Sequence, residues 1–175
     1  ATTFNQKAEA LYQQNVLSVM EEVWHKEGER IDLVIFLNGI AIFTFELKCN
    51  TSGQNYEDAI RQYKFERDYK TRLLKFKAGC LAHFAMDLNE VYMCTNLKGK
   101  SSFFLPFNKG CGVGIHSGKG NPHNENGINV SYMWEDILKK DTVLYLIDKI
   151  IFLQKETKKD PDTGKRVTKE TLIFP

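Results

Sequence analysis

Residues 31–48 read IDLVIFLNGIAIFTFELK, two apolar runs separated by Asn38-Gly39. An Asn-Gly pair between β-branched and aromatic residues is a strong β-hairpin signal. Both runs are apolar at nearly every position, whereas a half-exposed strand would alternate between apolar and polar residues. The sequence therefore predicts two adjacent antiparallel strands in the middle of a sheet that is covered on both faces.

The polar exceptions, Asp32, Glu46 and Lys48, all fall at the same end of this hairpin. With a strict two-residue loop, Asp32 would face Phe45, and Glu46 and Lys48 would lie on the opposite side of the sheet. With a three-residue loop, a type I turn followed by a bulge with a left-handed glycine, Asp32 would lie across from Thr44 and share a face with Glu46 and Lys48. We expect such an odd loop or bulge near the Asn-Gly pair.

Two carboxylates on one face predict a cation site. At a separation of roughly 4 Å they repel by about 4 kcal/mol at an effective dielectric constant near 20, which calls for a divalent cation or a proton. Without a cation, this repulsion should raise the pKa of one carboxyl group. Asp32 and Glu46, with a backbone carbonyl and waters, form the oxygen-rich shell that suits Mg²⁺ beside a phosphate. Lys48 could then orient the attacking water or neutralise charge on the phosphate.

The order of Asp, hairpin and Glu-x-Lys resembles the core of the PD-(D/E)xK nucleases. Further segments resemble the N-terminal region of the restriction subunit of type I restriction-modification enzymes. They are Asp32-Leu-Val-Ile-Phe-Leu-Asn-Gly-Ile, Phe45-Glu-Leu-Lys, Glu57-Asp-Ala-Ile-Arg-Gln-Tyr-Lys, Leu105-Pro-Phe-Asn-Lys-Gly and Glu170-Thr-Leu-Ile-Phe-Pro. The resemblance spans most of the chain and rests on the order of these segments.

Apolar periodicity predicts the elements around the hairpin. We expect a helix within residues 4–15, a strand over 16–25, a helix that begins after an Asn55 N-cap, strands over 80–86 and 91–95, and a short edge strand over 103–107. This order predicts an α/β fold of the restriction-endonuclease type, a central mixed β-sheet flanked by helices. Glu21 and Glu22 in the first strand are either solvated edge charges or further metal ligands. His83, inside an apolar strand, is expected to be a core histidine.

The chain is expected to form a single domain, residues 1–175, with its core in about 1–107. Residues 108–129 are rich in Gly and Asn and are expected to form a mobile loop, near DNA through Lys109 and Lys119. Two helices, residues 132–138 and 143–153, should be anchored by Trp134 and Tyr145. The charged stretch 155–169 is interpreted as a turn or flexible linker.

The helix after Asn55 carries the candidate DNA contacts. Arg61, Lys64 and Arg67 recur at spacings of three and form either a phosphate-contacting row or an ordinary charged helix face. The resemblance implies a role for Gln62, because related nucleases place DNA with a Gln-x-x-x-Tyr helix beside the metal. Here the fourth residue on is Glu66, and Tyr63 follows Gln62 directly, so only the Gln matches; the apolar spacing places Tyr63 in the core.

Composition limits the other possibilities. The formal net charge is +2, so any nucleic-acid site must be a local patch. The four cysteines have no metal or disulfide spacing, which indicates reduced thiols in a cytoplasmic protein. No signal peptide or membrane span is visible. The first residue is not Met and the last follows an apolar run, which suggests a piece of a longer protein.

The sequence thus predicts a Mg²⁺-dependent endonuclease domain that acts on double-stranded DNA. Asp32, Glu46 and the Leu47 carbonyl would hold the metal, and Lys48 and Gln62 would complete the catalytic set. The resemblance further implies that an ATP-driven motor follows Pro175, in a complex with methyltransferase and specificity subunits. The alternatives are a non-catalytic DNA-binding or docking module of the same fold, and a different PD-(D/E)xK nuclease such as a DNA repair enzyme.

Overall fold

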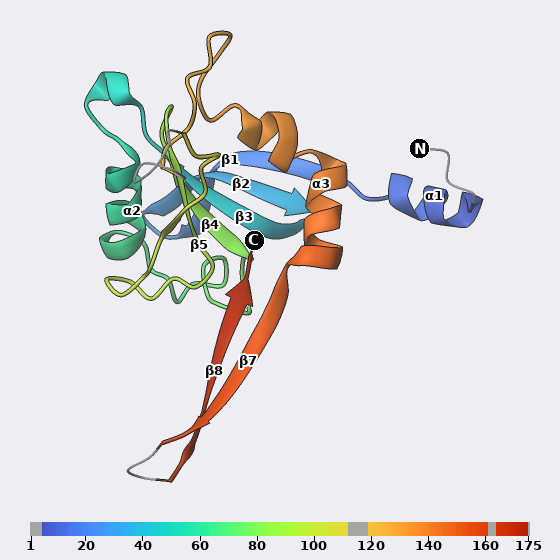
Figure 1. The fold of residues 1–175 in the computed structure, drawn as a ribbon, viewed down its shortest axis with the longest axis vertical. Helices are drawn as coiled ribbons and strands as arrows, with labels where there is room; N and C mark the ends of the chain where they lie inside the picture. The colour runs from blue at the N-terminus through green and yellow to red at the C-terminus, as the bar shows by residue number, and fades with distance from the viewer. Residues whose placement is uncertain (1–4, 112–118, 161–163, 175) are drawn as a thin grey trace.

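A six-stranded sheet forms the centre of the protein (Figure 1), whose computed structural model describes residues 5–111, 119–160 and 164–174. The strands lie in the order β1 to β6 across this sheet. Their bounds are β1 Leu17–Lys26, β2 Glu29–Leu37, β3 Ile40–Leu47, β4 Ala82–Met86, β5 Val91–Cys94 and β6 Leu105–Pro106.

The sheet is mixed because a helix separates its two halves. Strands β1, β2 and β3 form an antiparallel meander, and the connection through α2 (Tyr56–Phe65) makes β4 parallel to β3. Strands β5 and β6 continue antiparallel to β4, with Pro106 at the edge. The predicted α/β architecture of the restriction-endonuclease type is confirmed.

The β2–β3 hairpin contains the predicted irregularity, but in another form. Leu37 pairs with Ile40, so Asn38 and Gly39 form a two-residue loop, and both have positive φ values of 51° and 79°. These values suit a type I′ turn. The extra residue lies further along, because the register shifts at Ile35 and Phe36, which pair with Phe43 and Ala41. Ile42 is therefore the bulged residue, and the expected three-residue loop is wrong.

Two hydrophobic clusters cover the two faces of the sheet. One contains Ala59 and Tyr63 of α2 with Val34 and Ala85 of the sheet. The other packs Phe43, Phe45 and Phe84 against Val130, Met133 and Val143 from the segment beyond residue 119. The sheet is thus sandwiched between α2 and the later helical segment (Figure 1), as the apolar character of β2 and β3 predicted.

In the later helical segment, the side chains that face the core are not the predicted ones. It consists of the π-helical turns η3 (Met133–Ile137) and η4 (Leu146–Ile150), with α3 (Lys140–Tyr145) between them. Met133 and Val143 are buried, whereas Trp134 and Tyr145 are 46% and 59% exposed, so the predicted anchors are wrong. The prediction assumed a continuous 3.6-residue period, which these short π-helical turns do not keep.

The charged C-terminal stretch forms a second, two-stranded sheet instead of a linker. Strands β7 (Phe152–Lys159) and β8 (Arg166–Ile173) pair antiparallel and project from the body (Figure 1). Opposite charges face each other where Lys155 pairs with Glu170 and Glu156 pairs with Lys169. Such cross-strand pairs stabilise a hairpin, which explains how a run with so many charges becomes regular structure.

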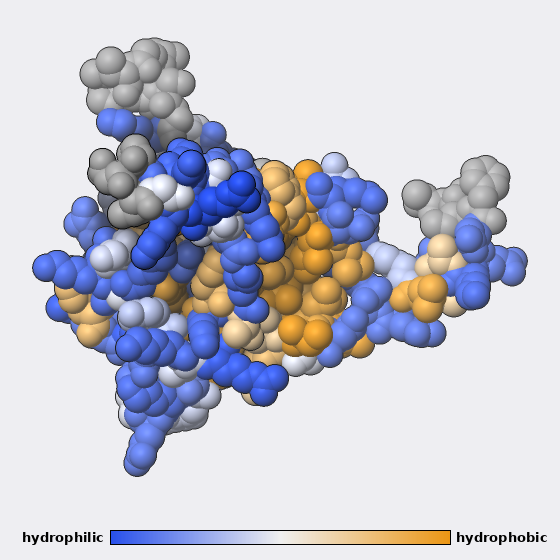
Figure 2. Space-filling view, turned by 90° about the horizontal axis from the view of Figure 1, so that it is seen from below, coloured by the Kyte–Doolittle hydropathy of each residue, from blue (hydrophilic) through white to orange (hydrophobic). Residues whose placement is uncertain are grey.

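Other parts of the chain lie where the sequence indicated. Helix α1 (Gln6–Gln13) stands apart from the sheet at one end of the molecule, and Figure 2 shows hydrophobic surface between α1 and the hydrophilic opposite end.

Part of the predicted loop 108–129, residues 112–118, falls outside the described residues. Its flank is fixed where the Lys109 ammonium lies 5.0 Å from the centre of the Tyr132 ring. All four cysteines are free thiols.

Within the part of the chain that the structure describes, no helix has the length and apolar character needed to cross a membrane.

Candidate active site

The register of the hairpin brings Asp32 and Glu46 together. Leu33 pairs with Phe45, so one residue further along Asp32 lies opposite Glu46 and not opposite Thr44 as expected. Asp32 Oδ2 accepts a hydrogen bond of 2.7 Å from the Leu47 N–H, the amide that follows Glu46. This register and hydrogen bond place the two carboxyl groups close together, and the Asp32 charge accordingly raises the pKa of Glu46. The predicted side-by-side arrangement is present, through the bulge at Ile42.

Glu46 is fully buried and carries an ion pair to Arg67. The Arg67 Nε–H donates to Oε1 over 2.6 Å, and Nη2 donates to Oε2 over 3.3 Å. Burial nevertheless raises the pKa of Glu46 to about 7, because loss of hydration outweighs the hydrogen bonds and charge of Arg67. Repulsion from Asp32 adds to the shift. The expected direction of the pKa shift is thus present, with burial as its main cause.

Lys48 follows directly after β3 and is half-buried. Its backbone N–H donates to the Met86 carbonyl oxygen over 2.9 Å, which extends the parallel pairing of β3 with β4 by one residue. Its charge lowers the pKa of Glu46, so the ammonium acts on the same site as Arg67. Asp32, Glu46 and Lys48 are therefore gathered at one end of the sheet.

Helix α2 covers this end and begins with the predicted cap. The Asn55 side chain accepts from the Glu57 N–H, and Asp58 completes a capping box. Tyr63 points inward, where its hydroxyl is 2.8 Å from Thr44 Oγ1, and Thr44 Oγ1 is 2.8 Å from His83 Nδ1. All three are fully buried, so the predicted core positions of Tyr63 and His83 are confirmed.

Gln62 is partly exposed on α2 beside the buried Tyr63. Its carbonyl oxygen accepts from the Glu66 N–H over 2.9 Å at the end of the helix.

The predicted row of basic residues on α2 is interrupted. Arg61 is 63% exposed and pairs with Glu66 over 3.3 Å, and Lys64 is half-buried in the last turn. The helix ends at Phe65, so Arg67 lies beyond it and points to Glu46 with only 10% of its side chain exposed. Arg67 therefore does not continue the surface row in this structure.

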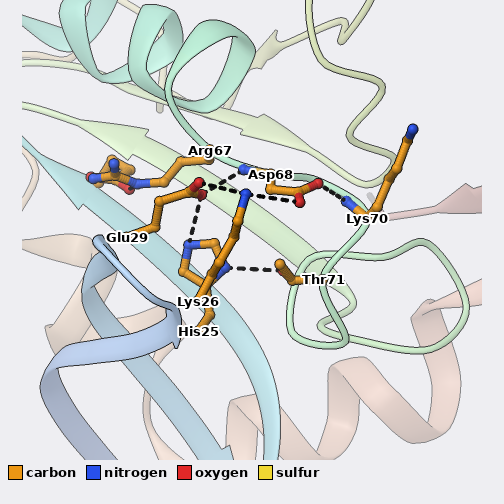
Figure 3. Close-up of polar contacts among 8 residues, drawn as sticks. His25, Lys26, Glu29, Arg67, Asp68, Lys70 and Thr71 are labelled. Atoms are coloured by element: carbon orange, nitrogen blue, oxygen red, sulfur yellow. Dashed lines mark hydrogen bonds and ion pairs between the residues drawn. The ribbon is translucent and has the colours of Figure 1, made fainter.

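A polar cluster next to Arg67 has no counterpart in the sequence interpretation (Figure 3). The Asp68 N–H donates to Glu29 Oε2 over 2.7 Å, and Lys26 contacts both Glu29 and Asp68, at 3.1 and 3.2 Å. His25 Nδ1 lies 3.0 Å from Thr71 Oγ1. The cluster joins the β1–β2 turn to the segment after α2, between residues about 40 positions apart, and local sequence patterns contain no signal for such contacts.

Asp87 is a second residue that the sequence did not single out. It is 5% exposed and follows β4 at the same end of the sheet. Its Oδ1 accepts from the Asn89 and Glu90 amides, and its Oδ2 accepts from the Tyr56 amide and the Asn50 side chain. Asp87 thus ties the start of α2 to the sheet; the only signal in the sequence was its position between the predicted strands 80–86 and 91–95.

Neither of the two earlier acidic candidates completes a three-acid site. Glu22 is ion-paired with Arg30 at the exposed edge strand, and Glu21 is exposed. Among the described residues, no group of three or more His, Cys, Asp or Glu side chains is placed to hold a metal ion. The site therefore offers two carboxylates and a neighbouring backbone carbonyl, which is the sparse oxygen set that Mg²⁺ accepts when waters and phosphate fill the remaining positions.

Comparison with curated proteins and with solved structures finds no match. A family model described as the type I restriction enzyme R protein N terminus matches residues 7–102. The matched range includes β1 to β5, α2 and every candidate site residue, and β6 at Leu105–Pro106 lies beyond it. On this match over more than half of its length, the chain belongs to the family of type I restriction enzyme R protein N-terminal domains.

Proposed function

We propose that this chain is a Mg²⁺-dependent endonuclease domain that hydrolyses DNA phosphodiester bonds within a type I restriction enzyme. The observation that carries the proposal is the alignment of Asp32 with Glu46 at the open end of the β2–β3 hairpin, with Lys48 acting on the same site. Two carboxylates that meet beside an ammonium group cost stability in a purely structural role, because the fully buried Glu46 loses hydration and the neighbouring Asp32 repels it.

Asp32, Glu46 and the Leu47 carbonyl are the proposed ligands of Mg²⁺. The bound ion would supply Lewis-acid activation of the phosphate and of the attacking water. Lys48 would orient this water and stabilise negative charge on the phosphate. Gln62 and the exposed end of α2, through Arg61 and Lys64, would position the DNA backbone.

The wider setting follows from the family. The R subunit would add an ATP-driven translocating motor to this domain, and the complex would include methyltransferase and specificity subunits acting on cytoplasmic double-stranded DNA. Cleavage would then follow translocation, and no nucleotide site is proposed within this chain.

A non-catalytic docking module is the second candidate, and one observation favours it. Arg67 is already ion-paired with Glu46, so this carboxylate has a cationic partner without a metal ion. A supercoiled-plasmid nicking assay with Mg²⁺, run on this chain and on the full complex, separates the two. Nicking that is lost in Asp32→Ala supports the nuclease; a complex that translocates DNA but never nicks it supports docking.

Metal binding should stabilise the fold. Mn²⁺ at about a hundredfold excess over its dissociation constant should raise the free energy of unfolding by about 2.7 kcal/mol, because the ion binds only the folded state. Thermal melts with and without millimolar Mn²⁺ measure this effect. Asp32→Ala should abolish the Mn²⁺ shift, and an equal shift in that variant would place the ion elsewhere.

DNA binding should depend on the exposed end of α2. Arg61→Ala and Lys64→Ala should each weaken binding to all DNA sequences and reduce the slope of log K against log salt by about one unit, because each removes one phosphate contact. Titrations of a labelled duplex at several salt concentrations measure the slope. An unchanged slope would assign these residues to an ordinary charged helix face.

A further inference from the structure

Arg67 uses both oxygens of the candidate metal ligand Glu46. Its Nε and Nη2 atoms lie 2.6 and 3.3 Å from the two carboxylate oxygens, and the side chains are 10% and 0% exposed. A guanidinium group on a carboxylate is a strong, charge-assisted contact. In this structure the cation that neutralises Glu46 is thus supplied by the protein itself.

The backbone that carries Arg67 is held in place independently of this ion pair. The Asp68 amide is bonded to Glu29, Lys26 joins both of their carboxylates, and the Asp68 side chain accepts from the Lys70 amide over 3.0 Å. Figure 3 shows the Arg67 side chain extending away from this cluster, in the direction opposite to Lys70. Arg67 could therefore change its partner by moving its side chain alone.

A metal ion and Arg67 would compete for Glu46. Positive charges a few ångströms apart repel, and the buried surroundings of Glu46 weaken solvent screening of that repulsion. Arginine also binds phosphate with the same two-donor geometry that it uses for carboxylates. A guanidinium released from Glu46 beside a bound nucleic acid would have a phosphate as its natural new partner.

We propose that Arg67 is a positioning residue that holds Glu46 in place of the metal ion and exchanges it for a DNA phosphate when the ion and DNA bind. The inference rests on the proposed metal-dependent function. It predicts that DNA and the metal ion raise each other's affinity. The ion displaces Arg67 from Glu46, and a DNA phosphate binds the displaced guanidinium group; this coupling must be reciprocal.

The first test measures Mn²⁺ affinity by calorimetry on the 175-residue protein without DNA. Arg67→Gln should bind Mn²⁺ about tenfold more tightly than the wild type, because the competing cation is gone. Arg72→Gln is the matched control, since it removes the same charge from an exposed position in the same connecting segment. Asp32→Ala identifies the site at which the ion binds.

The second test needs no substitution at Arg67 and remains informative if Arg67→Gln fails to fold. In the wild-type protein, the NMR signal of the Arg67 Nε–H should move away from its Glu46-bonded position as Mg²⁺ saturates the site. The coupling is measured with a short duplex in a Lys48→Ala background that keeps the DNA intact. The duplex should tighten Mn²⁺ binding in that background and do so less when Arg67→Gln is added.

The outcomes separate this inference from the function on which it rests. Wild-type binding that Asp32→Ala abolishes, with equal or weaker affinity in Arg67→Gln, would overturn the exchange and leave the metal site standing. An Arg67 signal that is unchanged at saturating Mg²⁺ would do the same. Absence of Mn²⁺ binding in the wild type and in Arg67→Gln alike would overturn both the inference and the proposed function.

Discussion

Lys48→Ala will lower DNA cleavage by the assembled enzyme by about 10²–10³-fold, the loss expected when one group that stabilises transition-state charge is removed. DNA affinity should change little, because an interaction made only in the transition state contributes to rate and not to ground-state binding. The side chain is half-buried beside Glu46, close to the proposed site of the reacting phosphate. Plasmid cleavage and duplex binding, measured on the same preparation, give the two numbers.

The motor proposed for the parent enzyme would supply an internal control for this result. ATP hydrolysis and translocation should persist in Lys48→Ala, since in the proposed function the nuclease domain acts only after the motor has moved the DNA. Lys75→Ala, at an exposed position after α2, controls for the loss of one positive charge. Cleavage at the wild-type rate in Lys48→Ala would reduce Lys48 to an ion-pair partner of Glu46 or Asp32, and the proposed active site would be wrong.

The centre of the fold was predictable because its signals are local. Asn38-Gly39 marks the turn, and the continuous apolar runs on either side mark buried strands. The sequence also predicted that Asp32 and Glu46 share a face, because one extra residue in the loop or in a bulge brings them to the same side of the sheet. It did not predict where this extra residue lies. A type I′ turn and a bulged three-residue loop both suit an Asn-Gly pair, and the bulge at Ile42 depends on how β3 packs within the sheet.

The role of Arg67 lay outside the reach of sequence periodicity. A spacing of three from Lys64 suggested that it continues a helix face, but α2 ends at Phe65. The following segment is drawn to the β1–β2 turn by the bond between Asp68 and Glu29, 39 positions apart. The β7–β8 hairpin was missed for a similar reason. Two of its charged pairs, Lys155 with Glu170 and Glu156 with Lys169, bring opposite charges together across the strands, and this pairing is visible only once the two strands are aligned.

The pH dependence of stability offers a direct test of the environment of Glu46. Its pKa of about 7 in the folded protein lies above the ordinary value of 4.5, so the folded state binds more protons than the unfolded state between these two values. The free energy of unfolding of the metal-free protein should therefore fall as pH rises through this window. The contribution of Glu46 is about 3 kcal/mol, present below pH 4.5 and lost above pH 7.

Buried His83 changes the free energy of unfolding with pH in the opposite direction, so its effect must be separated from that of Glu46. Burial lowers the pKa of His83 to about 3, so its neutral form favours folding above its ordinary pKa of 6.5 and this stabilisation is lost as pH falls. Wild type and Glu46→Gln both contain His83, and its effect cancels in their difference. Glu57→Gln, on the exposed side of α2, reports the effect of net charge alone.

The free energy of unfolding of Glu46→Gln, relative to that of the wild type, should rise by about 3 kcal/mol as pH rises from 4.5 to 7. The reason is that the amide is never charged and avoids the cost of burying a carboxylate. Urea titrations at half-unit pH intervals with a chelator present measure the difference. If the difference shrinks with rising pH, the ion pair with Arg67 outweighs burial and keeps Glu46 ionised. Saturating Mn²⁺ should reverse the gain at pH 7, since only the wild type then has both carboxylates for the ion.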